Sequence, residues 1–381
     1  MNTVVLQQPK RLLFGLGCAQ RAVDEFAAAG RKRLFVVSGP TVAQATAPLV
    51  ATWRAAGIAV EVYDRVNREP EIALFEHVLA AAQAFRPDGI VGLGGGSPID
   101  TAKLVAALLD GRQPVRETWG VGNLRGRNVW LAAIPTTAGS GAEVSPNAVL
   151  IDEAEKLKKG VVSPFLVADL AICDPELTVS SPPGVTAATG IDALVHCMEG
   201  YANKAAHPAA DLYALEGVRR IGRSIETAVK NGGDRNARAD VMLGAIYGGL
   251  CLGPVNTPAV HALSSPLGGE YRVAHGVANS LLMPHVFRFN LPAMPERYAD
   301  IALALGMKPA ANALATAEAG LARLAQMSTA CGVPQRLRDV KIPEADLPRL
   351  AREAMKLQRI LKNNPREVTE ADALAIYRAA F

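Results

Sequence analysis

The chain has 381 residues, which is more than one ordinary hydrophobic core accommodates and therefore predicts two domains. Half of its residues are hydrophobic and 20% are charged, proportions typical of a globular enzyme and not of a disordered or fibrous chain. The 40 Lys and Arg against 36 Asp and Glu give a formal net charge of +4, too small and too scattered to indicate nucleic acid or an anionic membrane as a partner.

The cysteines and the hydrophobic runs indicate where the protein works. Its five cysteines are an odd number without a CxxC pair, which is typical of reduced thiols in a reducing compartment. The first residues lack the long apolar run of a secretory signal, and no window approaches the roughly 18 uninterrupted apolar residues of a membrane span. We therefore expect a soluble, cytoplasmic protein.

The first half of the chain alternates β-branched runs with alanine-rich stretches of helical periodicity. Residues 8–17 predict a small entry strand or hairpin. Further strands are expected at residues 34–38, 59–63, 90–93, 130–134 and 168–173, with helices that include residues 43–56 and 72–85. Strands that alternate with helices predict a parallel sheet covered by helices on both faces.

The pattern changes at residues 180–183. Strand-like runs almost vanish there, and helical periodicity rich in Ala, Leu and Arg continues to the C-terminus, with residues 310–330 and 347–361 as long examples. We therefore predict an α/β domain over residues 1–182 and an all-helical domain over residues 183–381. Ligands of parallel sheets bind beyond the carboxyl ends of the strands, so we expect the site in the cleft between the two domains.

A glycine-rich loop, GGGSPIDTAK at residues 94–103, directly follows an apolar strand and opens a helix. Glycines let a ligand approach the backbone closely, and the free N–H groups and dipole of the helix favour a diphosphate. Ser97 is expected to cap the helix, with Pro98 at its first position. A tight strand-to-helix turn without a ligand is the alternative, because the loop is neither the G-x-G-x-x-G fingerprint nor a Walker loop.

A second polar loop, PTTAGSGAE at residues 135–143, follows the next predicted strand. Parallel strands deliver both loops to the same edge of the sheet. Two such loops on one edge favour a nucleotide site over a bare turn.

Four residues form a candidate metal site. Asp192 and His196 stand at positions i and i+4, which places both side chains on one face if the stretch is helical. The alternative is an aspartate in the first turn of a helix beside a buried, hydrogen-bonded histidine. His261 and His275 follow in a stretch whose Gly and Pro residues indicate irregular structure. One carboxylate and three imidazoles suit iron or zinc, with room for a substrate oxygen.

Taken together, these segments resemble the iron-containing (group III) alcohol dehydrogenase family, within the larger group that includes glycerol dehydrogenase and dehydroquinate synthase. The resemblance spans essentially the whole chain and rests on FGLG, GGGSPIDTAK, PTTAGSGAEVSPNAVL, DPELTVSSPP, TGIDALVHCMEGY, HGVANSLLMPHV and NPREVTEADALAIYRAA. It implies a dehydroquinate synthase-like fold with an N-terminal dinucleotide-binding α/β domain and a helical C-terminal domain.

The resemblance also implies the residues of the site. The metal, Fe²⁺ or alternatively Zn²⁺, would be bound by Asp192, His196, His261 and His275. The diphosphate of NAD or NADP would lie on Gly95, Gly96 and Ser97, with Asp100 nearby. The rest of the cofactor groove would be lined by Thr136, Thr137, Asn147 and Lys158.

Three positions depart from the family pattern. Ser265 stands where members typically carry a histidine four residues after the third metal ligand, which leaves the route of the proton open between Ser265, the cofactor ribose and water. Gly39 follows the first long strand, where an Asp often repels the 2′-phosphate of NADP, so NAD and NADP both remain open. Glu69 stands before Pro70 in place of the usual Asn.

The expected function is a metal-dependent oxidoreductase that transfers a hydride between NAD(P) and a small alcohol or aldehyde, in a homodimer or larger homo-oligomer without nucleic-acid or membrane partners. One alternative is an NAD- and metal-dependent lyase or cyclase similar to dehydroquinate synthase, which regenerates its cofactor internally. Another is a non-catalytic nucleotide-binding protein, although the presence of all four candidate metal ligands argues against it. No catalytic residue beyond the metal ligands is assigned.

Overall fold

The computed structural model describes residues 3–67, 69–155 and 157–381. Contacts between Cα atoms divide the chain into two compact units. We call Leu6–Ser181 the α/β unit, and Pro182–Phe381 together with residues 3–5 the helical unit. A parallel sheet in the first unit and helices in the second confirm the expected fold class. In the part of the chain that is described, no helix is both long and apolar enough to cross a membrane.

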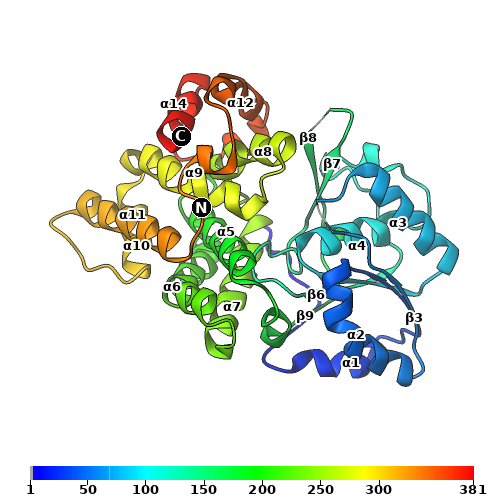
Figure 1. Cartoon of the computed structure of the whole chain (residues 1–381). Coiled ribbons are helices and arrows are strands. Elements are labelled where there is room, and N and C mark those ends of the chain that lie inside the picture. The colour runs from blue at the N-terminus through cyan, green and yellow to red at the C-terminus, as the bar shows by residue number, and fades with distance from the viewer. Residues whose placement is uncertain (1–2, 68, 156) are drawn as a thin grey trace. The chain divides into compact units, whose positions relative to one another are not determined.

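A six-stranded, entirely parallel sheet forms the centre of the α/β unit (Figure 1). In spatial order its strands are β1 (Arg11–Phe14), β9 (Leu170–Cys173), β6 (Trp130–Pro135), β4 (Gly89–Gly94), β2 (Arg33–Val37) and β3 (Ala59–Tyr63). The strands expected at residues 34–38, 59–63, 90–93, 130–134 and 168–173 are present with bounds within two residues of the prediction, and the entry segment at residues 8–17 contains the shorter strand β1. The inner strands are near-continuous apolar runs because helices cover both faces of the sheet.

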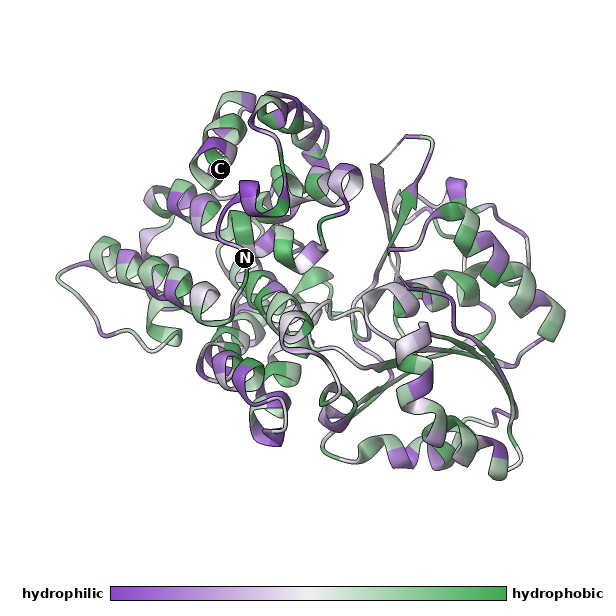
Figure 2. Ribbon diagram, viewed as in Figure 1, coloured by the Kyte–Doolittle hydropathy of each residue, from purple (hydrophilic) through white to green (hydrophobic). Residues whose placement is uncertain are grey.

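Two hydrophobic clusters hold those helices in place. Phe26 of α1 (Ala22–Ala28) and Trp53 of α2 (Pro40–Ala55) pack on one face of the sheet. Phe75 of α3 (Ile72–Phe85) and Ile99 of α4 (Gly96–Leu108) pack on the other. Figure 2 shows the strands as mostly hydrophobic and the helices as mixed, which is the pattern of a covered parallel sheet.

A second, three-stranded sheet was not expected from the sequence. Its order is β5 (Gly120–Val121), β8 (Leu157–Val162) and β7 (Asn147–Asp152), with β7 and β8 antiparallel. The turn between β7 and β8 is charged, and Lys158 and Lys159 lie in β8, so the hydrophobic pattern of a strand is weak there.

The helical unit is built around α5 (Pro183–Tyr201), which packs against α6, α7 and α9 and is almost wholly buried beyond its first turn. The other helices are α6 (Pro208–Lys230), α7 (Arg235–Leu252), α8 (Ala259–Tyr271), α9 (His275–Asn290), α10 (Pro295–Ala304), α11 (Ala313–Ala330), α12 (Leu347–Met355), α13 (Gln358–Leu361) and α14 (Glu370–Ala380). No strand occurs in residues 182–381, all of which are described.

Three local expectations are wrong. Gly95, in an extended conformation, is the N-cap of α4 and Ser97 lies inside the helix, because the chain turns into the helix one residue after the strand ends. The predicted helix over residues 347–361 is split into α12 and α13, because Leu357 leaves the helical region with a ψ of 42°. The stretch around His261 is the regular helix α8, which includes Pro266.

Candidate metal centre and cofactor loops

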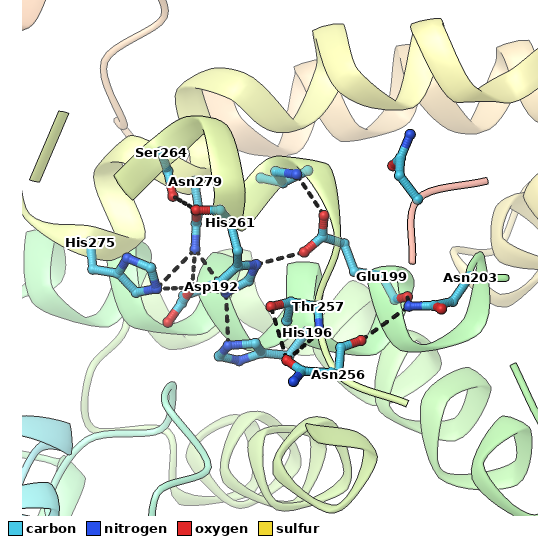
Figure 3. Close-up of polar contacts among 12 residues, drawn as sticks. Asp192, His196, Glu199, Asn203, Asn256, Thr257, His261, Ser264, His275 and Asn279 are labelled. Atoms are coloured by element: carbon cyan, nitrogen blue, oxygen red, sulfur yellow. Dashed lines mark hydrogen bonds and ion pairs between the residues drawn. The ribbon is translucent and has the colours of Figure 1, made fainter. Parts of the chain in front are cut away.

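The helical unit brings the four predicted metal ligands together (Figure 3). Asp192 and His196 lie on α5, His261 lies in the first turn of α8, and His275 is the first residue of α9. One ligand atom from each residue lies within 4.8 Å of the corresponding atoms of the other three. Three different helices therefore supply one compact group of nitrogen and oxygen donors.

The position of Asp192 decides between the two explanations offered for the Asp-His pair. Asp192 lies in the middle of α5, so the alternative of an aspartate in the first turn of a helix is wrong. Asp192 and His196 are one helical turn apart and leave the same face of α5. Each is 5% exposed, so this face is closed to bulk water.

Distances within the cluster are short. His196 Nε2 lies 2.9 Å from His261 Nε2, and Asp192 Oδ1 lies 3.8 Å from His261 Nε2 and 3.7 Å from His275 Nε2. Burial acts to raise the pKa of Asp192, but the three imidazoles and the amide of Asn279 outweigh it and lower that pKa to about 2. The cluster therefore contains an ionised carboxylate at neutral pH.

Two further residues join the cluster that the sequence interpretation missed. Asn279 Nδ2 donates to Asp192 Oδ1 at 2.6 Å and lies 3.2 Å from the Nε2 atoms of His261 and His275. Glu199 contacts the far side of the His261 ring, with Oε2 2.6 Å from Nδ1. Helical spacing could have identified both residues. Glu199 follows His196 by three residues and Asn279 follows His275 by four, so each lies on the same helical face as a candidate ligand.

The chemistry of this site fits a divalent transition metal. Three imidazole nitrogens and one carboxylate oxygen are ligands that iron and zinc both accept. Asn279 is fully buried, and its Oδ1 atom has no hydrogen-bond partner among the described residues. A buried polar atom without a partner is typical of a place where water or an ion belongs.

The predicted cofactor residues gather at the carboxyl ends of three neighbouring strands in the α/β unit. Gly39 follows β2, Gly95–Ser97 follow β4, and Thr136 and Thr137 follow β6. The amide of Thr136 donates to the carbonyl of Gly94 at 2.9 Å. A Cβ atom on Gly96 would lie 3.0 Å from Ser140 Oγ, so the two loops are in contact and the close approach favours glycine.

Asn147 begins β7, which is attached directly to α4. Asp100 Oδ2 accepts a hydrogen bond from the amide of Val149 at 3.1 Å. The buried Lys103 donates through Nζ to the carbonyl oxygens of Ser145 and Asn147, each at 2.8 Å. The helix that follows the glycine loop thus fixes the position of the hairpin.

Lys158, on β8, is paired with Glu69. Its Nζ atom lies 2.5 Å from Glu69 Oε1, and the side chains are 11% and 35% exposed. Glu69 is one of the three positions that depart from the family pattern. In this chain Glu69 forms an ion pair with Lys158, the lysine that the resemblance assigns to the cofactor groove.

Burial shifts the charges beside the glycine loop. It lowers the pKa of Lys103 to about 8, although the negative charges of Asp100 and Glu143 act to raise that pKa. It raises the pKa of Asp100 to about 6, and that of Glu143 to about 7. Sequence reasoning identified Asp100 but missed Lys103 and Glu143.

The chain matches two family models that together cover nearly its whole length. Residues 9–175 match the iron-containing alcohol dehydrogenase model, and residues 186–381 match the C-terminal model of the Fe-containing alcohol dehydrogenase family. The long-chain-alcohol dehydrogenase 1 of Geobacillus thermodenitrificans is 38% identical over 379 residues, which is 96% of this chain and 94% of that protein.

Solved structures agree with the sequence relatives. A crystal structure of 1,3-propanediol oxidoreductase has a TM-score of 0.96 and 33% identity, with all of both chains covered. Sulfoacetaldehyde reductase from Bifidobacterium kashiwanohense in complex with NAD⁺ has a TM-score of 0.89 and 25% identity, with 100% of this chain and 99% of the other covered. Neither the lyase nor the non-catalytic alternative finds any counterpart among these relatives. The chain belongs to the iron-containing alcohol dehydrogenase family and is an oxidoreductase of alcohols and aldehydes that uses NAD(P) and a metal ion.

Proposed function

We propose that Asp192, His196, His261 and His275 together bind one divalent ion, iron in the first place and zinc as the alternative. The observation that carries this proposal is the mutual distance of their four ligand atoms, all within 4.8 Å. The ionised Asp192 offsets part of the charge of the ion, and the imidazoles complete a site that leaves room for a substrate oxygen.

We propose further that the loops after β4 and β6 bind the diphosphate of NAD or NADP. The first amides of α4, at Gly96 and Ser97, have no partner within the helix and favour an anion. Gly95 completes the glycine loop, and Thr136 and Thr137 supply hydroxyl groups beside it. Asp100, Asn147 and Lys158 belong to the same proposal, as residues that line or support the groove.

The chain positions the reactants, and the bound groups supply the chemistry. When bound, the metal ion polarises the oxygen of an alcohol or aldehyde, and the nicotinamide accepts or donates the hydride. Asp192 and the three histidines would hold the ion, and through it that oxygen, because their side chains meet from three helices. Gly39 carries no charge that would repel a 2′-phosphate, so both NAD and NADP are included in the proposal.

A homodimer or larger homo-oligomer is also part of the proposal. Strand β1 lies at one end of the described sheet, so its outer edge has no neighbouring strand there. Its Leu12 and Phe14 side chains are 40% and 36% exposed. An exposed edge with apolar side chains is a template for pairing with a second chain.

We also propose a cytoplasmic location. The five cysteines are all free, which agrees with a reducing compartment.

A spectrophotometric screen tests the proposed function. The protein is stripped of metal, reloaded with Fe²⁺ or Zn²⁺, and offered NAD or NADP with short alcohols and aldehydes while the absorbance of the reduced nicotinamide is followed. We expect turnover that requires the added metal. Turnover that is equal in the stripped protein and in the reloaded protein would refute the metal assignment.

A further inference from the structure

We propose that Glu199 is a positioning residue for the metal centre, which holds His261 in the tautomer whose Nε2 atom carries a free lone pair. The inference rests on the proposed function, because it assumes that His261 is a metal ligand. It adds a residue that acts through His261 and touches neither the metal nor the substrate.

The geometry places the Glu199 carboxylate between two donors of α8. Oε2 lies 2.6 Å from His261 Nδ1, and Oε1 accepts a hydrogen bond from the amide of Val260 at 2.6 Å. Glu199 is 1% exposed, so both contacts are shielded from bulk solvent. Two short bonds from one buried carboxylate fix both the start of α8 and the ring that follows it.

The chemistry of the carboxylate decides which nitrogen of His261 carries the proton. Carboxylate oxygens accept hydrogen bonds, and Oε1 already accepts from the Val260 amide, so the donor in the 2.6 Å contact with Oε2 is the imidazole Nδ1–H. In the neutral ring, Nε2 then carries no proton and has a free lone pair. This nitrogen lies inside the cluster, 2.9 Å from His196 Nε2. A carboxylate that accepts from the outer nitrogen of a metal-binding histidine also raises the basicity of the inner nitrogen.

Helix α5 supplies this residue together with two of the ligands. Asp192, His196 and Glu199 follow one another at intervals of four and three residues, so they line one face of the same buried helix. The face that presents the Asp-His pair to the metal therefore also orients the third ligand.

The test compares the Zn²⁺ affinity of the full-length protein and of its Glu199→Gln variant, by competition with a chromogenic chelator. Glutamine can still accept from the Val260 amide, but its NH₂ group then faces Nδ1 and favours the tautomer with a proton on Nε2. We expect Zn²⁺ binding to weaken on the order of 10- to 100-fold. The Glu226→Gln variant is the control, since Glu226 is a carboxylate of the same unit paired with Arg323 at 2.6 Å, and should leave the affinity unchanged.

The outcomes separate this inference from the proposed function. If wild-type protein and the His261→Ala variant bind Zn²⁺ equally well, the metal assignment fails, and the inference with it. If His261→Ala loses Zn²⁺ while Glu199→Gln binds it as tightly as wild type does, the metal assignment stands and the inference is overturned.

A second measurement needs no change at Glu199 and serves if the variant does not fold. Nitrogen-15 NMR of histidine-labelled, metal-free wild-type protein reports the tautomer of each ring, and the His261→Ala spectrum assigns the signal. We expect His261 to carry its proton on Nδ1, and a proton on Nε2 instead would overturn the inference.

Discussion

The ammonium nitrogen of Lys103 lies 2.8 Å from the main-chain oxygen of Asn147, which joins α4 to the first residue of β7. A second bond of 2.8 Å reaches the carbonyl of Ser145, and Asp100 Oδ1 lies 3.9 Å away. Lys103 is fully buried, so these contacts of its ammonium group are shielded from bulk solvent. A buried cation here holds the hairpin of β7 and β8 against the helix that opens at the glycine loop.

Replacing Lys103 by Met should therefore destabilise the protein and weaken cofactor binding. The variant keeps the volume of the side chain but removes the ammonium donor from the carbonyls of Ser145 and Asn147, at a cost of about 2–4 kcal/mol in the free energy of unfolding. Urea denaturation measures that loss, and the KM for NAD(P) should rise more than kcat falls. Lys159→Met is the control, because Lys159 pairs with the exposed Glu155, and its loss should change stability by less than about 1 kcal/mol. Equal stability of the two variants would contradict the assigned role.

Loss of His261 should remove the metal but leave the fold intact. His261→Ala deletes one of the four donors of the cluster, and the other three remain on α5 and α9. Elemental analysis of the purified variant should find almost no iron or zinc, its circular dichroism should match that of wild type, and turnover should be lost. His77→Ala removes an exposed histidine of α3 and should retain metal and activity. Normal turnover in the His261 variant would refute the ligand set.

Glu143 should make the protein less stable as the pH rises from about 4.5 to about 7. Burial raises the pKa of this side chain from 4.5 to about 7, so in this window the folded state holds a proton that the unfolded state has released. The stabilisation is complete below about pH 4.5 and is lost as the pH passes about 7, an effect of roughly 3 kcal/mol at most. Glu143→Gln cannot titrate, so the difference in unfolding free energy between variant and wild type should grow across this window. A constant difference from pH 4 to 8 would show that Glu143 does not titrate there.

Substitution at Gly39 should separate steric from charge effects on the choice of cofactor. A Cβ atom at this position would lie 2.6 Å from the carbonyl oxygen of Val66, so any side chain displaces the backbone, at about 1–3 kcal/mol. Gly39→Asp and Gly39→Asn share that cost and differ only in charge. We expect the Asp variant alone to disfavour NADP relative to NAD, by about tenfold in kcat/KM. The same NADP/NAD ratio in both variants would show that a charge at position 39 is not felt by the 2′-phosphate.

Periodicity was enough to predict the elements that position the site. The apolar runs before Gly94 and Thr136 identified β4 and β6, and the interval from Asp192 to His196 predicted one shared helical face. Local pattern did not reveal β7 and β8. Part of what holds that hairpin is remote in sequence, since Lys103 binds a carbonyl 44 residues away. The break at Leu357 has no proline or glycine to mark it.

The supporting residues of the metal centre were harder to predict than its ligands. Glu199 and His261 are 62 residues apart, so only the packing of α5 against the start of α8 shows that they meet. The four candidate ligands were named from their residue types and spacing and from a family resemblance, whereas Glu199 and Asn279 are identified only by contacts in the folded chain.

If the cluster at which α5, α8 and α9 converge binds the metal as proposed, the ion becomes a part of the fold. His196 and His261 are 65 residues apart in the chain, so the unfolded protein offers no comparable set of donors. An ion that binds only the folded state stabilises it by mass action, by about 2.7 kcal/mol when its free concentration is a hundred times its Kd. A cell that runs short of this metal would then lose more than turnover. The helical unit would unfold locally more often, and the supply of the ion would then affect how fast the protein is degraded by proteases.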